Sequence, residues 1–124
     1  MENSPCCVVR SILERLESGK TPNGADYVFF GNFGKTAIEL IHLKKNVTIR
    51  RHRHRHTASV FYVIYGSGEI GIGKRTVSYS AGNQFKVPRM VFHAIQPKEE
   101  TLFIVMETPP IENPATGKVD MLYG

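Results

Sequence analysis

The spacing of hydrophobic positions changes once along the chain. In the first twenty residues, apolar side chains recur at helical spacing, at Val9, Ile12, Leu13 and Leu16. Ser4 is a candidate N-cap residue before them, and Gly19 is a natural stop after them. The pattern predicts a short N-terminal helix, and a turn cluster after it completes a segment of residues 1–24.

From Tyr27 onward, short apolar segments are separated by Gly, Asn and Pro, which is typical of strands and turns. No second helical segment of useful length interrupts them, so a parallel α/β fold is not expected. Turn signals about every 8–12 residues instead predict an all-β antiparallel sandwich or barrel. The predicted strands are Tyr27–Phe30, Thr36–Leu43, Val47–His54, Val60–Tyr65, Glu69–Ile72, Arg75–Tyr79, Gln84–Val87, Val91–Ile95 and Leu102–Glu107.

Length and composition fit one globular domain. The chain has 124 residues, of which 41% are hydrophobic and 22% charged, so disorder is not the expected main state. After residues 1–24 we place a barrel at 25–108 and an extended tail at 109–124, where three prolines oppose regular structure. No apolar run approaches the ~18 residues of a membrane span, and no secretory signal is recognisable, so we expect a cytoplasmic protein without membrane contact.

The positive charge of the chain, +5 in net, is concentrated in one segment that contains Lys44, Lys45, Arg50, Arg51, Arg53 and Arg55. A basic excess makes nucleic acid or anionic lipid a candidate partner, but a local cluster indicates one feature of the fold. Cys6 and Cys7 are adjacent, so we expect reduced thiols and no disulfide framework.

Histidines are concentrated in the same segment. Alternation along a strand places His52, His54 and His56 on one face, and Arg51, Arg53 and Arg55 on the other. Imidazole nitrogens at positions i and i+2 can reach one metal ion at about 2.0–2.1 Å. A solvated basic face or a phosphate-binding patch is the competing interpretation. Nucleic acid would need exposed aromatic residues nearby, and those that follow lie in an apolar run. His93, in a later strand, favours the metal site.

On these residues the chain resembles the cupins, a family of double-stranded β-helix barrels with a metal site. Their first motif is glycine, five residues, His-x-His, three or four residues, glutamate, six residues and glycine. The second is glycine, five residues, proline, one residue, glycine, two residues, histidine, three residues and asparagine. Both spacings hold here, and the resemblance covers residues 36–107. The positions of the first motif fall on Asn46, His52, His54, Ser59 and Gly66, and those of the second motif fall on Gly82, Pro88, Met90, His93 and Pro97.

The resemblance implies an all-β, cupin-like antiparallel jelly roll after the short helix, with a metal held by His52, His54 and His93. Ser59 stands where the family has a glutamate ligand, and a serine hydroxyl is a poor ligand, so we do not assign it to the metal. A divalent ion held by neutral imidazoles keeps a charge near about +2. Such a site favours an anionic, chelating ligand and leaves positions open for water, substrate or dioxygen.

Other residues are weaker candidates. His56 is a candidate fourth ligand or rim contact. A register with His54 and His56 as the pair would move the glycine anchors to Thr48 and Ser67, which match worse. His42 has no motif position and is expected to be structural. Candidate pocket residues are Ser59, Tyr62, Gln84 and Met90. Candidate acids or bases, each more readily explained as structural, are Glu39, Glu69, Tyr62, Tyr65, Gln84 and Lys86.

The strand of the first motif contains a conflict. Val47 and Ile49 share the face of Arg51, so one face would be apolar first and cationic later. Either the strand bulges near Arg50, or it passes from a covered region to an exposed rim.

Two functional hypotheses follow. The first is a metal-dependent enzyme, a dioxygenase-like oxidoreductase or an isomerase or lyase, that acts on a small anionic chelating substrate. The second is a non-catalytic cupin that binds a sugar or organic acid beside a structural or ligand-anchoring metal. The complete histidine set favours the first, and the missing glutamate favours the second. The expected cofactor is one divalent transition metal ion, for which imidazoles suit Fe, Mn, Ni, Cu or Zn. A homodimer is also implied by the resemblance.

Overall fold

The computed structural model describes residues 18–20 and 24–124, and every helix or strand assigned within them is a β-strand. The predicted N-terminal helix falls mostly on residues outside this part of the chain. Its predicted end is wrong, because Ser18–Lys20 forms a strand (β1) that pairs antiparallel with Asp26, Tyr27 and Val28. Helical propensity is a weak preference, and pairing with a neighbouring strand overrides it here.

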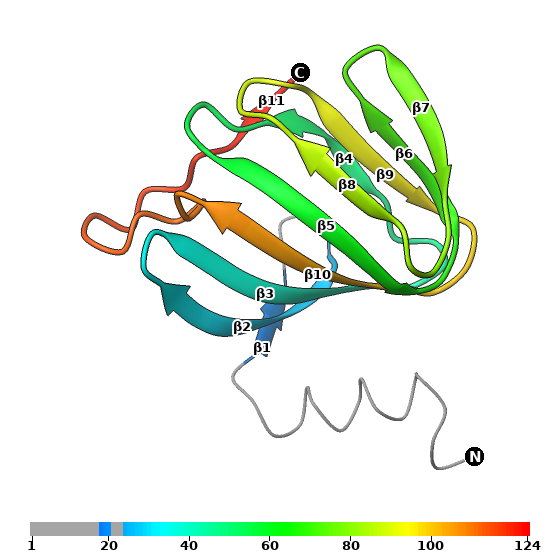
Figure 1. Ribbon diagram of the computed structural model, residues 1–124, viewed down its shortest axis with the longest axis horizontal. Helices are drawn as coiled ribbons and strands as arrows, with labels where there is room; N and C mark the ends of the chain where they lie inside the picture. The colour runs from blue at the N-terminus through cyan, green and yellow to red at the C-terminus, as the bar shows by residue number, and fades with distance from the viewer. Residues whose placement is uncertain (1–17, 21–23) are drawn as a thin grey trace.

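The strands form two antiparallel sheets that face each other (Figure 1). Sheet A has the order β1-β2-β3-β10-β5-β8, and sheet B has the order β11-β4-β9-β6-β7. The chain is therefore an all-β double-stranded β-helix, as the sequence predicts. The other bounds are β2 (Asp26–Phe33), β3 (Thr36–Leu43), β4 (Ile49–Arg53), β5 (Ala58–Tyr65), β6 (Gly68–Ile72), β7 (Arg75–Tyr79), β8 (Gln84–Val87), β9 (His93–Pro97), β10 (Thr101–Thr108) and β11 (Leu122–Tyr123).

The inner faces of the two sheets supply the hydrophobic core. In sheet A, Phe103 and Val105 are fully buried at alternate positions of β10, and in sheet B Ile70 and Ile95 face them from β6 and β9. The ring of Phe103 lies 5.6 Å from that of Phe61. The bounds of β3, β7 and β8 are those that the sequence predicts.

A β-bulge in β4 resolves the conflict between its faces. Ile49 pairs with Ile95, and His52 pairs with His93, so β4 has one residue more than β9 between the two pairs. The extra residue lets Ile49 and His52 both face the interior, although they lie an odd number of positions apart. Of the two predicted explanations, the bulge near Arg50 is the one the structure contains.

The C-terminal segment crosses from one sheet to the other (Figure 1). It leaves β10 of sheet A and ends on sheet B, where Leu122 and Tyr123 of β11 pair with Arg53 and His52 of β4. The described ranges contain no helix with the length and apolar character of a membrane span.

Candidate metal centre

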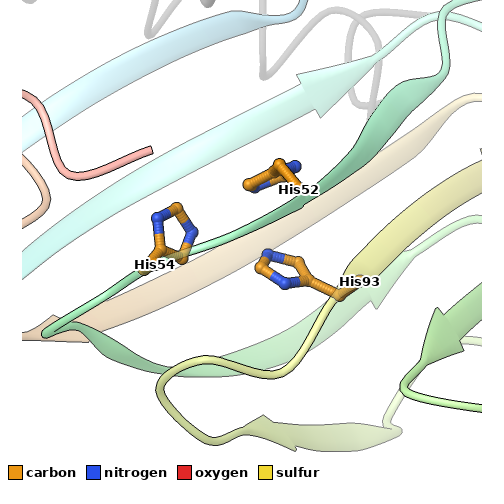
Figure 2. Close-up of side chains that lie close together, drawn as sticks. All are labelled: His52, His54 and His93. Carbon is orange, nitrogen blue, oxygen red and sulfur yellow. The ribbon is translucent and has the colours of Figure 1, made fainter. Parts of the chain in front are cut away.

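Three buried histidines from two neighbouring strands meet inside the barrel (Figure 2). His52 lies in β4, His54 follows that strand by one residue, and His93 begins β9 as the cross-strand partner of His52. Each ring offers one ligand nitrogen, and these nitrogens all lie within 4.8 Å of one another. The ring centroids are 4.2 Å apart for His52 and His93, 4.9 Å for His52 and His54, and 5.1 Å for His54 and His93.

Main-chain carbonyl groups decide which ring nitrogen faces the centre. A carbonyl oxygen only accepts hydrogen bonds, so the ring nitrogen beside it carries the hydrogen and the other nitrogen keeps a free lone pair. Metal-binding histidines are typically oriented in this way. In each ring Nδ1 donates: His52 to Arg50 at 2.7 Å, His54 to Asp120 at 2.5 Å, and His93 to Val91 at 3.2 Å.

Burial keeps the three rings neutral. Their exposed fractions are 5% for His52, 3% for His54 and 2% for His93. Desolvation lowers the pKa of His52 and of His54, and desolvation together with the neighbouring His52 lowers the pKa of His93 to about 3. At neutral pH, protons therefore do not compete with a metal ion for the Nε2 lone pairs.

Asp120, in the C-terminal segment, fixes the loop that follows His54. Its carboxylate accepts hydrogen bonds from the main-chain N–H groups of Arg55, His56 and Thr57, at 2.7, 2.7 and 3.1 Å. Desolvation would raise the pKa of Asp120, but these three donors outweigh it and lower the pKa. Because its own carbonyl oxygen accepts from His54, Asp120 positions the loop and the imidazole together.

The donor set fits a divalent transition metal ion. Neutral imidazole nitrogens suit Fe, Mn, Ni, Cu and Zn, and the carbonyl groups behind them orient the rings. Among the described residues, the cluster of metal-ligand side chains consists of the three histidines and includes no carboxylate. Ser59 is buried on the inner face of β5 but adds no charge. An ion held here would therefore keep a charge of about +2.

The other predicted site residues lie outside this cluster. His56 is exposed and meets Asp120 only through its main-chain N–H, so the geometry favours His52 and His54 as the motif pair. Tyr62 and Gln84 are cross-strand partners with exposed side chains on the outer face of sheet A. Met90 is also exposed, although its main-chain N–H donates to the carbonyl oxygen of His54 at 2.7 Å.

Two carboxyl side chains do face the interior. Glu107 follows Val105 at the next inward position of β10, is 5% exposed, and shares a hydrogen bond with Glu39 of β3. Burial, together with the charge of Glu39, raises the pKa of Glu107 to about 9, and burial raises the pKa of Glu39. From the sequence, Glu39 is a candidate acid or base more readily explained as structural, whereas Glu107 is not predicted. The sequence signal for an inward-facing Glu107 is the alternation of Phe103 and Val105, because Glu107 is the next residue in that series.

The remaining charged candidates have structural partners. His42 lies between Asp26, at 3.3 Å, and Glu100, at 2.8 Å, which agrees with its expected structural role.

The basic residues of the first motif stack on aromatic rings outside the cluster. The guanidinium of Arg50 lies 3.8 Å from the ring centre of Tyr123, and those of Arg51 and Arg53 each lie 4.5 Å from that of Phe92.

The fold and the histidine cluster define a cupin, and comparison with known families agrees. The cupin domain matches residues 39–106, and the chain belongs to this family. A search of curated proteins found no match.

Three solved structures share the fold. An RmlC-like cupin from Shewanella frigidimarina is 24% identical, with 81% of this chain and 89% of that chain covered and a TM-score of 0.73. KdgF from Halomonas sp. is 17% identical, with 80% and 93% covered and a TM-score of 0.73. A predicted oxalate decarboxylase from Thermotoga maritima is 13% identical, with 78% and 96% covered and a TM-score of 0.70.

Proposed function

We propose that His52, His54 and His93 bind one divalent transition metal ion, and that the protein is a metal-dependent enzyme for a small anionic chelating substrate. The observation that supports this is the convergence of three buried, neutral imidazoles whose Nδ1 atoms are already engaged. A bound ion would supply a Lewis acid with open coordination positions. The residues of the chain hold and orient the rings and exclude water around them.

The substrate class follows from charge. With three neutral ligands and no carboxylate, the centre favours ligands that bring negative charge, such as enolates, carboxylates, thiolates or hydroxy acids. One solved neighbour is named as a predicted oxalate decarboxylase, and oxalate is a small chelating anion. Both a dioxygenase-like reaction and an isomerase or lyase reaction are compatible with such a substrate.

Metal analysis of protein purified without a histidine tag tests the ligand assignment. We expect wild type to hold one metal ion per chain and His52→Ala and His93→Ala to lose it, because two imidazoles bind far more weakly than three. His56→Ala is the matched control, since this exposed histidine belongs to the same segment. If all four proteins hold the same metal at the same stoichiometry, the ligand assignment is wrong.

A non-catalytic binding cupin is the second candidate, and Ser59 in place of the motif glutamate favours it. Dioxygen uptake and product analysis with a panel of diketones, thiols and keto acids would separate the two. Turnover of any panel member supports the enzyme, whereas saturable binding without turnover supports the binding protein. The homodimer and the cytoplasmic location stay predictions.

A further inference from the structure

The carboxyl pair of Glu39 and Glu107 lies outside the cluster of His52, His54 and His93, yet on the sheet that faces the histidines. In sheet A, Val105 pairs with Phe61, and Glu107 pairs with Ser59 at the next inward positions. The ring of Phe61 lies 6.3 Å from the ring of His93. Glu107 therefore lies one step along β10 from the layer of side chains that contacts the cluster.

The pairing of β5 with β10 continues on the other side of Glu107, toward the loop that follows His54. Thr57 donates its main-chain N–H to Asp120, and Asp120 accepts from His54. The Thr57 hydroxyl donates to the carbonyl oxygen of Pro109, at 2.9 Å, two residues after Glu107. Along β10, Glu107 thus lies between Val105, the partner of Phe61, and the point where the loop after His54 joins sheet A.

Ser59 is the cross-strand neighbour of this carboxyl group. Directly opposed side chains of neighbouring strands have Cβ atoms about 4.5–5.5 Å apart, so Ser59 and Glu107 are immediate neighbours on the inner face. A glutamate at position 59 would place its own carboxylate beside Glu107. With serine there, the carboxyl group of Glu107 is the acidic group beside the position that the family motif gives to a ligand.

We infer that Glu107 is the acid and base of this centre and that Glu39 is its positioning residue. This inference rests on the proposed function. With the metal ion bound, the Glu107 carboxylate takes a proton from a ligand held beside the histidines and becomes a carboxyl group. In the other direction the carboxyl group returns this proton to the ligand and is left as a carboxylate. Glu39 holds the group through the shared hydrogen bond, and two buried carboxyl groups in contact retain one proton between them.

Few other titratable groups of the described residues face this pair. Sheet B contributes His52, His54 and His93, which are neutral. Tyr79 of β7 is buried too, but its hydroxyl is bound to Thr101 at 2.9 Å, six residues before Glu107. Tyr27 packs against the core from β2. Metal binding would therefore place a new positive charge opposite the only acidic pair on the described inner faces, and this charge favours loss of the shared proton.

Calorimetric titration with Zn²⁺ alone tests the inference, in buffers of different ionisation enthalpy at one pH near neutrality. We expect wild type to release about one proton more per bound Zn²⁺ than Glu107→Gln, because a nearby cation stabilises the ionised pair. Glu69→Gln, on an outward position of β6, is the matched control and should behave as wild type. Glu39→Gln should also change the release, since it removes the partner of Glu107.

The outcomes separate the two proposals. Equal proton release by wild type and Glu107→Gln overturns the role of the pair and leaves the metal centre intact. Loss of Zn²⁺ binding in a folded Glu107→Gln protein would make Glu107 a ligand and also overturn the role. Absence of Zn²⁺ binding in wild type overturns both proposals. If Glu107→Gln does not fold, infrared difference spectra of wild type decide, because the inference requires a protonated carboxyl band that disappears when Zn²⁺ binds.

Discussion

At the scale of single residues, burial imposes opposite protonation states on two kinds of group in the interior. The three histidines are neutral because the interior disfavours their charged form, and Glu107 is protonated for the same reason. Both states suit the proposed centre, since neutral imidazoles bind metal ions and a protonated carboxyl group can release its proton when a cation binds beside it. Each state also makes folding stability depend on pH.

Above about pH 6.5, the stability of the metal-free protein should decrease as the pH rises toward the raised pKa of Glu107. Its pKa is raised from 4.5 to about 9, so the folded state keeps a proton that the unfolded chain releases. This stabilisation is full below the unfolded pKa of 4.5 and is lost as the pH rises to about 9. Below about pH 6.5 the histidines oppose this trend, because burial lowers their pKa and the unfolded chain takes up protons there. Urea unfolding between about pH 6.5 and 9 should therefore show the decrease in wild type and a much flatter profile in Glu107→Gln. Parallel profiles would contradict the assignment, and Glu69→Gln serves as the control.

The sequence identified the three histidines, but not the contacts that bring residues from distant segments together around the centre. His52, His54 and His93 stand at motif spacing, which a single sequence displays directly. Glu107 and Ser59 lie 48 positions apart and become neighbours only through strand pairing. Asp120 and His54 are separated by 66 positions, and no local pattern marks Asp120. Spacing within a segment is visible in the sequence, whereas contacts between distant segments depend on the fold.

At the scale of elements, the sequence predicts the bounds of some strands and not of others. The predicted bounds hold for β3, whose inner face packs in the core, but not for β4, where the bulge adds a residue. The sequence already showed that a regular strand around Arg50 would have one face that is apolar first and cationic later, and the bulge resolves this conflict. β1 was missed because its backbone pairing with β2 is a tertiary contact.

The C-terminal segment should control metal affinity through Asp120. Asp120→Ala removes the acceptor for three N–H groups of the loop after His54, so the carbonyl oxygen that orients this ring loses its position. We expect Zn²⁺ affinity to fall about 10- to 100-fold, the usual cost of losing a group that orients a ligand. Calorimetric titration measures the Zn²⁺ affinity, and Glu112→Ala in the same segment is the control. Unchanged affinity in Asp120→Ala would show that the segment does not position His54.

At the scale of the whole molecule, the proposed ion connects parts that are distant in the sequence. His52 and His54 belong to one strand and its following loop, His93 belongs to another strand, and Asp120 adds the C-terminal segment. A ligand that binds only the folded state stabilises it by an amount set by its concentration relative to its dissociation constant.

Metal removal should therefore lower the thermal unfolding midpoint. At a free metal concentration 100 times the dissociation constant, the stabilisation is about 2.7 kcal/mol, which is several degrees for a domain of this size. Calorimetric scans of wild type with Zn²⁺ and with a chelator should show this difference. In His93→Ala, the two scans should nearly coincide, whatever the effect of the substitution itself. An equal shift in His93→Ala would place the stabilising metal elsewhere.

The use of main-chain carbonyl groups behind all three rings affects how the centre tolerates mutation over evolutionary time. Every amino acid has a carbonyl oxygen, so replacement of Arg50 or Val91 leaves the acceptors for His52 and His93 in place as long as the backbone keeps its course. Genetic drift at these two positions is therefore compatible with an intact centre. Asp120 differs, because its carboxylate also accepts hydrogen bonds from the loop that follows His54. Its replacement would therefore remove more than a main-chain carbonyl group could restore.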